Sequence, residues 1–292
     1  MRVALAQTDC ALGDVGRNLD TARDHIAQAA AQGADLVVFP ELSLHGYHLG
    51  GLEKDTSITT DDPRVLTLSA PEDPDGTEGP GGSRGPDVLL GFHEHTSLRA
   101  YNTAAYYTGG RLLHVHRKLY LPNYLAWEER KHVSPGQHLR AYDLPGGHGR
   151  AATLICNDAW QPVLPWLAVQ DGAEVIVVPT NSAASLDPEA MDTGLYWDTL
   201  LSYTARMLQC WVVFVNRVGN ENGASFWGGS RVVDPRGTVV AQAPKWEPGL
   251  VTVDIDVHEA RRQRRAVPLV AEARLGMVDR EVRRLIDEGG DS

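Results

Sequence analysis

The sequence contains few cysteines and no arrangement of them that would crosslink a small fold. Its three cysteines, Cys10, Cys156 and Cys210, are an odd number in 292 residues and include no Cys-x-x-Cys pair. This spacing argues against a disulfide framework and against a zinc knuckle. A chain of this length buries about three quarters of its unfolded surface, so its core needs neither a crosslink nor a structural metal to fold.

Basic residues and long apolar runs are also scarce. The 38 acidic residues outnumber the 27 basic ones, which gives a formal net charge of −11. Because phosphate binding needs a basic surface, neither a nucleic acid nor a membrane is expected as a partner. The longest apolar runs have about six residues, too few to span a bilayer, and residues 1–8 lack a signal-peptide core. We therefore expect a protein of a reducing compartment, the cytoplasm.

What the sequence does contain is an alternation of apolar strands with helical patterns. Residues 2–8, 18–32 and 35–39 predict a strand, a helix and a second strand. Further strands are expected at 88–92, 150–156, 173–178, 210–218 and 250–257, and turn signals at 109–110 and 234–237 predict hairpins. Hairpins among strand–helix units indicate an α/β fold with mixed sheets. We expect one domain over residues 1–292, with a core at 1–257, a charged helical tail at 258–292 and a long surface loop at 71–87.

Three of the predicted strands end in residues suited to acyl chemistry. Cys156 leaves an apolar strand just before a helix, Glu41 follows the strand at 35–39, and Lys118 follows a hairpin. Strand ends in α/β sheets face the crevice where ligands bind. Together these side chains supply a nucleophile, a general base and a cation for a developing oxyanion. Taken singly, each has a structural alternative: a buried cysteine, a helix-capping carboxylate or a solvated lysine.

The same residues make the chain resemble the nitrilase, or carbon–nitrogen hydrolase, superfamily over residues 2–257. Glu41 in Phe39-Pro40-Glu41, Lys118, and Cys156 in Cys156-Asn157-Asp158 match the base, lysine and nucleophile of that family. Glu129 matches a second glutamate that orients the lysine, and further matches lie at 101–103, 135–136 and 226–237. The resemblance implies an αββα sandwich, hydrolysis of non-peptide C–N bonds, and no cofactor or metal.

The resemblance also implies a role for each residue. Glu41 takes the thiol proton of Cys156 while the sulfur attacks the substrate carbon, and a thioester forms as ammonia or an amine leaves. Lys118 and the backbone N–H of Asn157 hold the oxyanion, and Glu129 holds Lys118. Pocket residues are expected beside these segments, with core packing as the alternative for each aromatic ring: Tyr47, Tyr124, Trp127, Trp160, Asn181 and Ser182.

Two His-x-His pairs have a spacing that zinc ligands use. His93 and His95, and likewise His114 and His116, would share one face of a strand. Neither pair is followed by a third ligand at a spacing typical of zinc sites, so no metal site is expected.

Several substrate classes remain open. The stretches 39–47 and 118–124 look most like the glutaminase domain of glutamine-dependent NAD synthetases, but that branch usually has Glu where Asn157 stands. A stand-alone amidase acting on a small amide is the first expectation. A glutaminase subunit that supplies ammonia to a partner synthetase is the second, and an N-carbamoyl hydrolase or a nitrilase is the third. Since the family commonly dimerises through C-terminal tails, a homodimer or higher homo-oligomer is expected.

Overall fold

Two six-stranded sheets dominate the structure. The computed structural model describes residues 1–70, 85–123, 127–185, 189 and 191–290. Most of the predicted loop at 71–87 lies outside these residues, and so does Tyr124. Each sheet has three central strands in parallel, flanked by antiparallel strands, which confirms the prediction of a mixed α/β fold.

The first sheet has the order β14-β1-β2-β3-β4-β5. Its strands are β14 (Gly249–Asp254), β1 (Arg2–Gln7), β2 (Leu36–Val38), β3 (Asp87–His95), β4 (Ala100–Thr108) and β5 (Arg111–Arg117). β1, β2 and β3 pair in parallel, whereas β14, β4 and β5 run antiparallel to their neighbours. The β4–β5 hairpin turns at Gly109 and Gly110, whose φ angles of 56° and 73° favour glycine.

The second sheet has the order β13-β12-β9-β8-β7-β6. Its strands are β13 (Val239–Gln242), β12 (Arg231–Val233), β9 (Trp211–Asn216), β8 (Val175–Thr180), β7 (Arg150–Thr153) and β6 (Tyr142–Asp143). β7, β8 and β9 pair in parallel. The remaining pairings are antiparallel, and the β12–β13 hairpin turns at the predicted residues 234–237.

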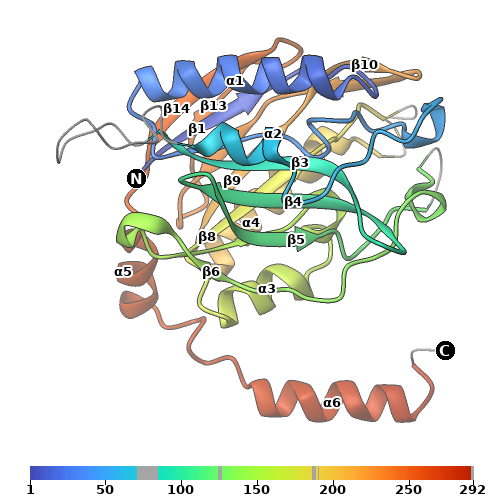
Figure 1. Cartoon of the computed structure of the whole chain (residues 1–292). Helices are drawn as coiled ribbons and strands as arrows, with labels where there is room; N and C mark the ends of the chain where they lie inside the picture. The colour runs from blue at the N-terminus through green and yellow to red at the C-terminus, as the bar shows by residue number, and fades with distance from the viewer. Residues whose placement is uncertain (71–84, 124–126, 186–188, 190, 291–292) are drawn as a thin grey trace.

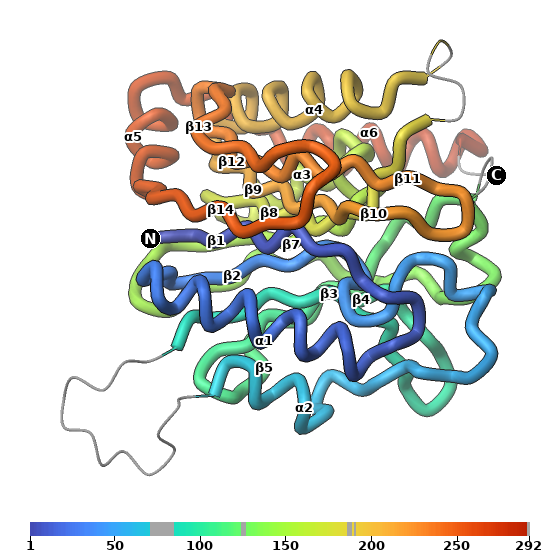
Figure 2. Tube along the Cα trace, turned by 90° about the horizontal axis from the view of Figure 1, so that it is seen from above, coloured from blue at the N-terminus to red at the C-terminus, as the bar shows by residue number. Residues whose placement is uncertain are grey.

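Helices cover the outer face of each sheet, so that the layers run helix, sheet, sheet, helix (Figures 1 and 2). α1 (Val15–Ala31) and the short α2 (Pro63–Leu66) lie on the first sheet, and α3 (Val163–Gln170) and α4 (Thr193–Leu208) lie on the second. Strand alternation accounts for this arrangement, because successive side chains point to opposite faces. Val3 and Leu5 pack between the sheets, whereas Ala4 and Ala6 pack against α1. This arrangement is the predicted αββα sandwich.

The ends of several elements differ from the prediction for local physical reasons. α1 begins at Val15 rather than at residue 18, because Oδ1 of Asp14 accepts the N–H of Arg17 at 3.0 Å and caps the helix. The strand predicted at 150–156 ends at Thr153, and a one-turn helix, η5 (Cys156–Asp158), follows it. Other single turns of this kind are η1 (Leu49–Gly51), η2 (Thr67–Ser69), η3 (Glu129–Lys131) and η4 (Pro145–Gly147).

A third hairpin was not predicted. The apolar strand expected at 210–218 divides into β9 and β10 (Val218–Glu221), and β10 pairs with β11 (Ala224–Trp227). The turn residues Asn222 and Gly223 have φ angles of 48° and 80°. Asn-Gly is the preferred pair for such a two-residue turn, so the signal was present in the sequence.

The C-terminal tail consists of α5 (His258–Ala266), which packs beside the sandwich, and α6 (Leu275–Asp287), which lies apart from it (Figure 1). α6 has no buried residue. Among the described residues, no helix combines the length and the apolar character needed to cross a membrane.

Candidate active site

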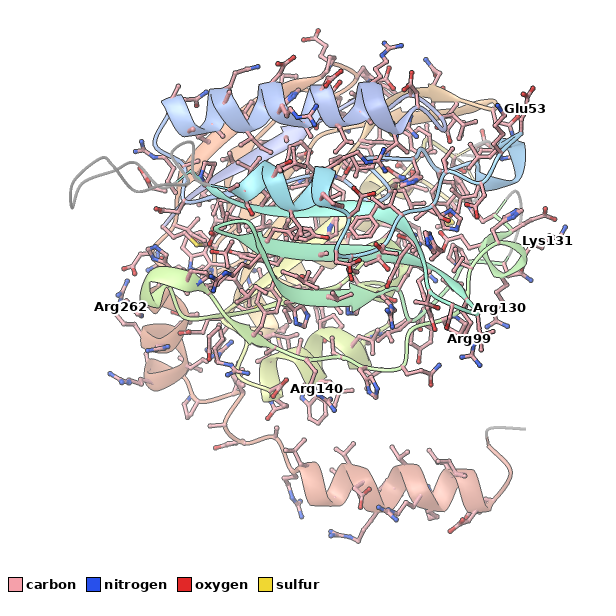
Figure 3. All side chains as sticks on the ribbon, viewed as in Figure 1. Glu53, Arg99, Arg130, Lys131, Arg140 and Arg262 are labelled. Atoms are coloured by element: carbon pink, nitrogen blue, oxygen red, sulfur yellow. The ribbon has the colours of Figure 1, made fainter. Side chains whose placement is uncertain are left out.

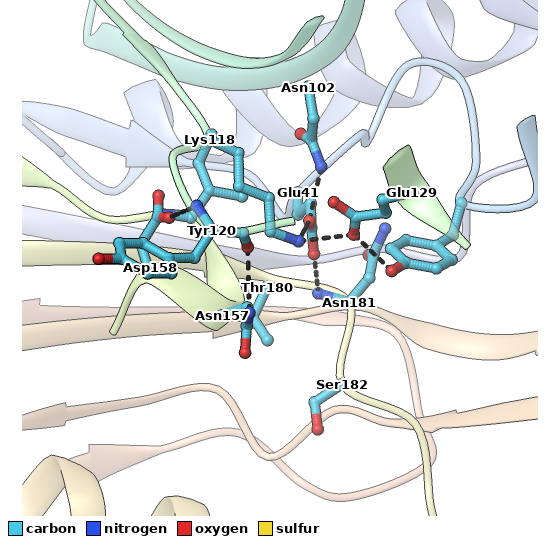
Figure 4. Close-up of polar contacts among 12 residues, drawn as sticks. Glu41, Asn102, Lys118, Tyr120, Glu129, Asn157, Asp158, Thr180, Asn181 and Ser182 are labelled. Carbon is cyan, nitrogen blue, oxygen red and sulfur yellow. Dashed lines mark hydrogen bonds and ion pairs between the residues drawn. The ribbon is translucent and has the colours of Figure 1, made fainter. Parts of the chain in front are cut away.

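Side chains from the ends of both sheets meet in one buried cluster. Glu41 follows β2, Lys118 follows β5, and Cys156 begins η5 after β7. β2 runs parallel to β3, and β3, β4 and β5 alternate in direction, so β2 and β5 run the same way. Their carboxyl ends therefore lie at the same edge of the sheet. Nζ of Lys118 lies 2.7 Å from Oε1 of Glu41 (Figure 4), and both side chains are 0% exposed.

The carboxylate of Glu41 is fixed by donors from two further elements. Nδ2 of Asn102, on β4, donates to Oε1 at 2.7 Å. The backbone N–H of Asn181, just beyond β8, donates to Oε2 at 2.8 Å. Since Lys118 also donates to Oε1, both oxygens of Glu41 are held in place. Asn102 was noted in the sequence only as part of the motif at 101–103, and no role was predicted for it.

Glu129 shares the ammonium of Lys118. Nζ of Lys118 lies 2.6 Å from Oε1 of Glu129, and the hydroxyl of Tyr47 donates to the same oxygen. Burial raises the pKa of Glu129 to about 7, with Lys118 opposing the rise and Glu41 adding to it. The other oxygen, Oε2, is buried and has no hydrogen-bond partner among the described residues. Glu129 therefore has one oxygen committed to Lys118 and one available to a ligand.

Opposite charges keep Lys118 protonated despite its burial. Desolvation alone would lower its pKa, but the carboxylates of Glu129 and Glu41 outweigh this and hold the pKa well above the usual value. The cluster thus carries a fixed ammonium group, which can stabilise negative charge that develops nearby.

Cys156 occupies a strained position at the start of η5. Its φ of 46° lies in the left-handed region, which a residue with a side chain seldom adopts. The residue is half-buried, yet desolvation and the Glu41 carboxylate raise the pKa of its thiol well above the usual value, against the opposing effects of Lys118 and the Asn181 N–H. The thiol is therefore protonated at neutral pH, and it needs a base in order to act as a nucleophile.

Asp158 joins the Cys156 turn to the Lys118 segment, and it was noted in the sequence only as part of the Cys156-Asn157-Asp158 motif. Its Oδ1 accepts the backbone N–H groups of Leu119 and Tyr120 at 2.9 and 2.8 Å. Its Oδ2 accepts the N–H of Ile155 at 3.1 Å and lies 2.8 Å from Nε2 of His116. One fully buried carboxylate thus fixes the backbone on both sides of the cluster.

A cavity of about 260 Å³ opens beside Glu129. Of the residues that the sequence indicated, Tyr47, Trp127 and Glu129 line it, and so do Asn102 and Phe226, which lie in the matched motifs. Lining residues that the sequence did not indicate come mainly from the segment after Tyr47, from the region of η3 and from the β10–β11 hairpin: Leu42, His48, Leu49, Gly50, Glu128, His132, Val133, Ala183, Ala184, Glu221, Asn222, Gly223 and Ala224. Only the Asn222-Gly223 turn signal could have pointed to the hairpin part of this wall.

The other predicted pocket residues lie in different surroundings. Trp160 stacks on Tyr196 at 5.5 Å, on the outer side of the second sheet. Ser182 accepts the indole N–H groups of Trp197 and Trp227 at 3.0 and 3.1 Å, and its side chain points away from Lys118 (Figure 4). Neither Trp160 nor Ser182 is among the described residues that line the cavity.

Asn157 and Asn181 remain beside the cluster. Nδ2 of Asn157 donates to the carbonyl of Tyr120 at 3.1 Å, which is a second link between the Cys156 turn and the Lys118 segment. The side-chain amide of Asn181 is buried, and neither its oxygen nor its nitrogen has a hydrogen-bond partner among the described residues.

The histidines of the two His-x-His pairs contact neighbouring side chains and backbone groups. His116 contacts Asp158, and His114 stacks on Tyr142 at 4.2 Å. The backbone N–H of His93 donates to Nδ1 of His45 at 3.1 Å. Within the described residues, no group of three or more His, Cys, Asp or Glu side chains is arranged to hold a metal ion.

An αββα sandwich with a glutamate, a lysine and a cysteine at neighbouring strand ends defines a hydrolase that acts on C–N bonds. The chain belongs to the carbon–nitrogen hydrolase family, whose sequence profile matches residues 2–265. The nitrilase-like fold and the enzyme class expected from the sequence are therefore confirmed.

Similar proteins include NAD(+) synthetases, amidases and other carbon–nitrogen hydrolases. The glutamine-dependent NAD(+) synthetase of Thermotoga maritima is 33% identical over 262 residues, which cover 90% of this chain but 43% of the synthetase. The chain thus spans less than half the length of that relative. The NitN amidase of Nesterenkonia sp. AN1 is 26% identical, with a TM-score of 0.72 and coverage of 91% of this chain and 97% of the amidase. A carbon–nitrogen hydrolase of Helicobacter pylori G27 has a TM-score of 0.80 at 18% identity, covering 97% of this chain and 98% of its own, which bears on the fold alone.

Proposed function

We propose that the protein is an amidase that hydrolyses a small amide through a thioester on Cys156. The observation that carries this proposal is the buried Lys118 ammonium, shared by Glu41 and Glu129 next to a protonated thiol. Glu41 accepts the thiol proton as the sulfur bonds to the amide carbon. The Lys118 ammonium and the backbone N–H of Asn157 hold the oxyanion.

The second half of the reaction uses the same groups. The oxyanion collapses, the C–N bond breaks, and Glu41 returns its proton to the leaving nitrogen, so that ammonia departs from a primary amide. Water then loses a proton to Glu41 and attacks the thioester, which releases the acid and restores the thiol. The free Oε2 of Glu129 and the unpartnered side chain of Asn181 are acceptors and donors suited to the substrate's amide group.

The cavity limits the substrate to a small molecule. Its volume of about 260 Å³ lies just below the usual range for ligand pockets, about 300 to 1,000 Å³. Amides with a few carbon atoms fit such a space, whereas a peptide chain does not.

A glutaminase that supplies ammonia to a partner synthetase is the second candidate, and the similarity to glutamine-dependent NAD(+) synthetases supports it. It predicts hydrolysis of glutamine that rises when a partner is added. An N-carbamoyl hydrolase or a nitrilase would use the same nucleophile and is distinguished by substrate.

The decisive experiment measures ammonia release from a panel of compounds, with Cys156→Ala in parallel. The panel holds glutamine, asparagine, short aliphatic and aromatic amides, N-carbamoyl amino acids and nitriles. Release from one class that depends on Cys156 supports the proposal and selects the branch. If the folded protein releases ammonia from none of these compounds, the proposal is contradicted.

We also propose a cytoplasmic location. Cys10, Cys156 and Cys210 are all unpaired in the structure. Free thiols persist in a reducing compartment, where glutathione and thioredoxin keep them reduced.

A homodimer formed through the C-terminal tail is proposed from the surface of α6. Leu275, Val282, Leu285 and Ile286 recur at helical spacing, and each is about half exposed. An apolar helix stripe that faces water is unfavourable, and a second copy would cover it. We expect the full chain to elute as a dimer in size-exclusion chromatography and a chain without residues 276–292 to elute as a monomer. Elution of both as monomers would reject the tail-mediated dimer.

Gly91 lies under the segment that carries Glu41 and leaves no room for a side chain. A Cβ at Gly91 would lie 2.5 Å from the carbonyl oxygen of Pro40 and 2.6 Å from the backbone nitrogen of Leu42. We expect Gly91→Ala to displace Glu41 and to lower kcat/KM by about 100-fold, since a shift of about 1 Å has this effect on a catalytic group. Gly249→Ala, in a strand of the same sheet with open space around the glycine, is the control. Equal activity of the two variants would contradict this account.

A further inference from the structure

The cavity beside Glu129 has an unusual balance of charge. Three of its lining residues are acidic: Glu128, Glu129 and Glu221. No Lys or Arg belongs to the described lining residues. The described lining also contains the imidazoles of His48 and His132.

The basic groups behind the wall are already engaged. Arg217 is 1% exposed, and its Nη1 lies 2.9 Å from Oε2 of Glu221 while its Nη2 donates to the carbonyl of Cys10 at 3.0 Å. Lys118 is shared by Glu41 and Glu129. Neither cation is therefore free to pair with a charge on the far end of a substrate.

The basic groups outside the cavity are at the molecular surface. Figure 3 shows Arg130 and Lys131 at the outer edge of the molecule. Nζ of Lys131 lies 2.6 Å from Oε1 of Glu128, and both side chains are more than half exposed. Such an exposed pair is weak and screened by salt, and of its two members only Glu128 is among the described residues that line the cavity.

Two stretches of sequence next to the lining residues contain no basic residue. Residues 124–126, which precede Trp127, are Tyr-Leu-Ala. Residues 185–192, which follow Ala184, contain three acidic residues and no Lys or Arg. Arg130 and Lys131 are therefore the basic residues in the sequence directly beside the described lining.

Aromatic rings form part of the cavity wall beside the acidic residues. The ring of Tyr47 lies 5.1 Å from that of Trp127, edge to face, and 6.4 Å from that of Phe226. All three residues line the cavity. Aromatic faces carry negative charge density, so they accept apolar groups and cations but repel anions.

We infer that the protein selects amides whose far end is neutral or cationic and rejects amides that carry a carboxylate there. This inference rests on the proposed amidase function and refines its substrate class. A carboxylate in the cavity would meet acidic groups and aromatic faces, and would lose its hydration without gaining a cation. Glutamine carries an α-ammonium group as well as an α-carboxylate at that end, and its carboxylate is expected to make it a poorer substrate than pentanamide. The amidase hypothesis is therefore favoured over the glutaminase hypothesis.

Three amides of nearly equal size test the inference: 4-aminobutanamide, pentanamide and 4-carbamoylbutanoate, with glutamine as a fourth. We expect kcat/KM at about pH 8 to be at least about tenfold lower for 4-carbamoylbutanoate than for pentanamide. The cationic amide should match or exceed pentanamide, and the discrimination should shrink in high salt. If 4-carbamoylbutanoate or glutamine is the best substrate, the inference is overturned while the amidase function stands.

Charge reversal at the cavity mouth supplies a matched pair of variants. Glu128→Lys should raise kcat/KM for 4-carbamoylbutanoate relative to pentanamide by at least about fivefold. Glu272→Lys changes the net charge equally at an exposed residue of the tail and should leave that ratio unchanged. Equal ratios in the two variants would show that the cavity charge does not select the substrate.

Alkylation of Cys156 tests the same selectivity without any turnover. Iodoacetamide is neutral and iodoacetate is anionic, and their rates at Cys156 can be followed by mass spectrometry of its peptide. We expect the ratio of the two rates to exceed that for free cysteine by about fivefold or more. A ratio equal to that for free cysteine would overturn the inference. A raised ratio in a protein that hydrolyses no amide would instead overturn the amidase function alone.

Discussion

The Lys118→Ala variant is expected to lose all measurable turnover and much of its stability at the same time. Its ammonium group lies 2.7 Å from Glu41 and 2.6 Å from Glu129. Removal of a single oxyanion donor typically lowers kcat by about 10² to 10³, and Lys118 also positions the base. The substitution leaves two carboxylates buried near each other without a cation, and loss of one partner of a buried ion pair costs about 3–5 kcal/mol.

The stability loss has a pH dependence whose sign follows from Glu129. Burial raises the pKa of Glu129 to about 7 even though Lys118 opposes the rise. Without Lys118 the pKa of Glu129 rises further above its ordinary value of 4.5. Above about pH 4.5 the folded variant therefore binds more protons than the unfolded chain. The variant is therefore most stable at low pH and loses stability as the pH rises through the raised value. Urea denaturation should show a larger difference from the wild type at about pH 8 than at about pH 5.

Cys156→Ala is the matched control for this prediction. It removes the nucleophile, which lowers kcat by about 10⁴ to 10⁶ in comparable hydrolases. It leaves the ion pairs of Lys118 in place, so its unfolding free energy and pH profile should stay close to those of the wild type. Near-normal activity in either variant, or an equal stability loss in both, would contradict the roles proposed for these residues.

The second large effect is expected at Asp158. Its carboxylate accepts three backbone N–H groups, those of Leu119, Tyr120 and Ile155, and contacts His116. In Asp158→Ala these groups stay buried without an acceptor, and each unsatisfied group costs about 1–3 kcal/mol. We expect a loss of at least about 4 kcal/mol in the free energy of unfolding. We also expect a fall in kcat, because the Lys118 and Cys156 segments are no longer held together.

Asp158→Asn removes the negative charge of the carboxylate but keeps the size and shape of the side chain. Its amide oxygen can still accept from Leu119 and Tyr120, whereas its amino group faces the N–H of Ile155. We expect an intermediate loss of stability in urea denaturation and partial activity. Asp171→Ala removes a carboxylate that accepts one exposed backbone N–H, that of Ala141, and is the control. A stability of Asp158→Ala equal to that of Asp171→Ala would contradict the account.

Part of the site could be predicted because strand ends are visible in a sequence. The apolar runs before Glu41, Lys118 and Cys156 end abruptly, and the carboxyl ends of like-directed strands meet at one edge of a sheet. Asn222-Gly223 was an equally local signal for the β10–β11 hairpin, and it was overlooked among the apolar residues on either side.

The rest depended on which way side chains point after the chain has folded. Trp160 and Ser182 follow the same strands as the cluster residues, but they pack toward the helices that cover the second sheet. Asn102 reaches Glu41 from β4, two strands away from β2 in the sheet, a relation that no short spacing in the sequence expresses.

By itself, the sequence determined the mixed α/β fold and the three chemical groups, because strand alternation, helical spacing and short motifs are local properties of the chain. The αββα layers were expected only from the family resemblance that those motifs carry. The tertiary structure alone decided the charge and shape of the cavity, since its described wall combines residues from five distant segments, around 47, 102, 128, 183 and 222. It also decided the partners of Asp158, which lie up to 42 residues away in the chain. Contacts between distant segments depend on the packing of the two sheets, which no local pattern records.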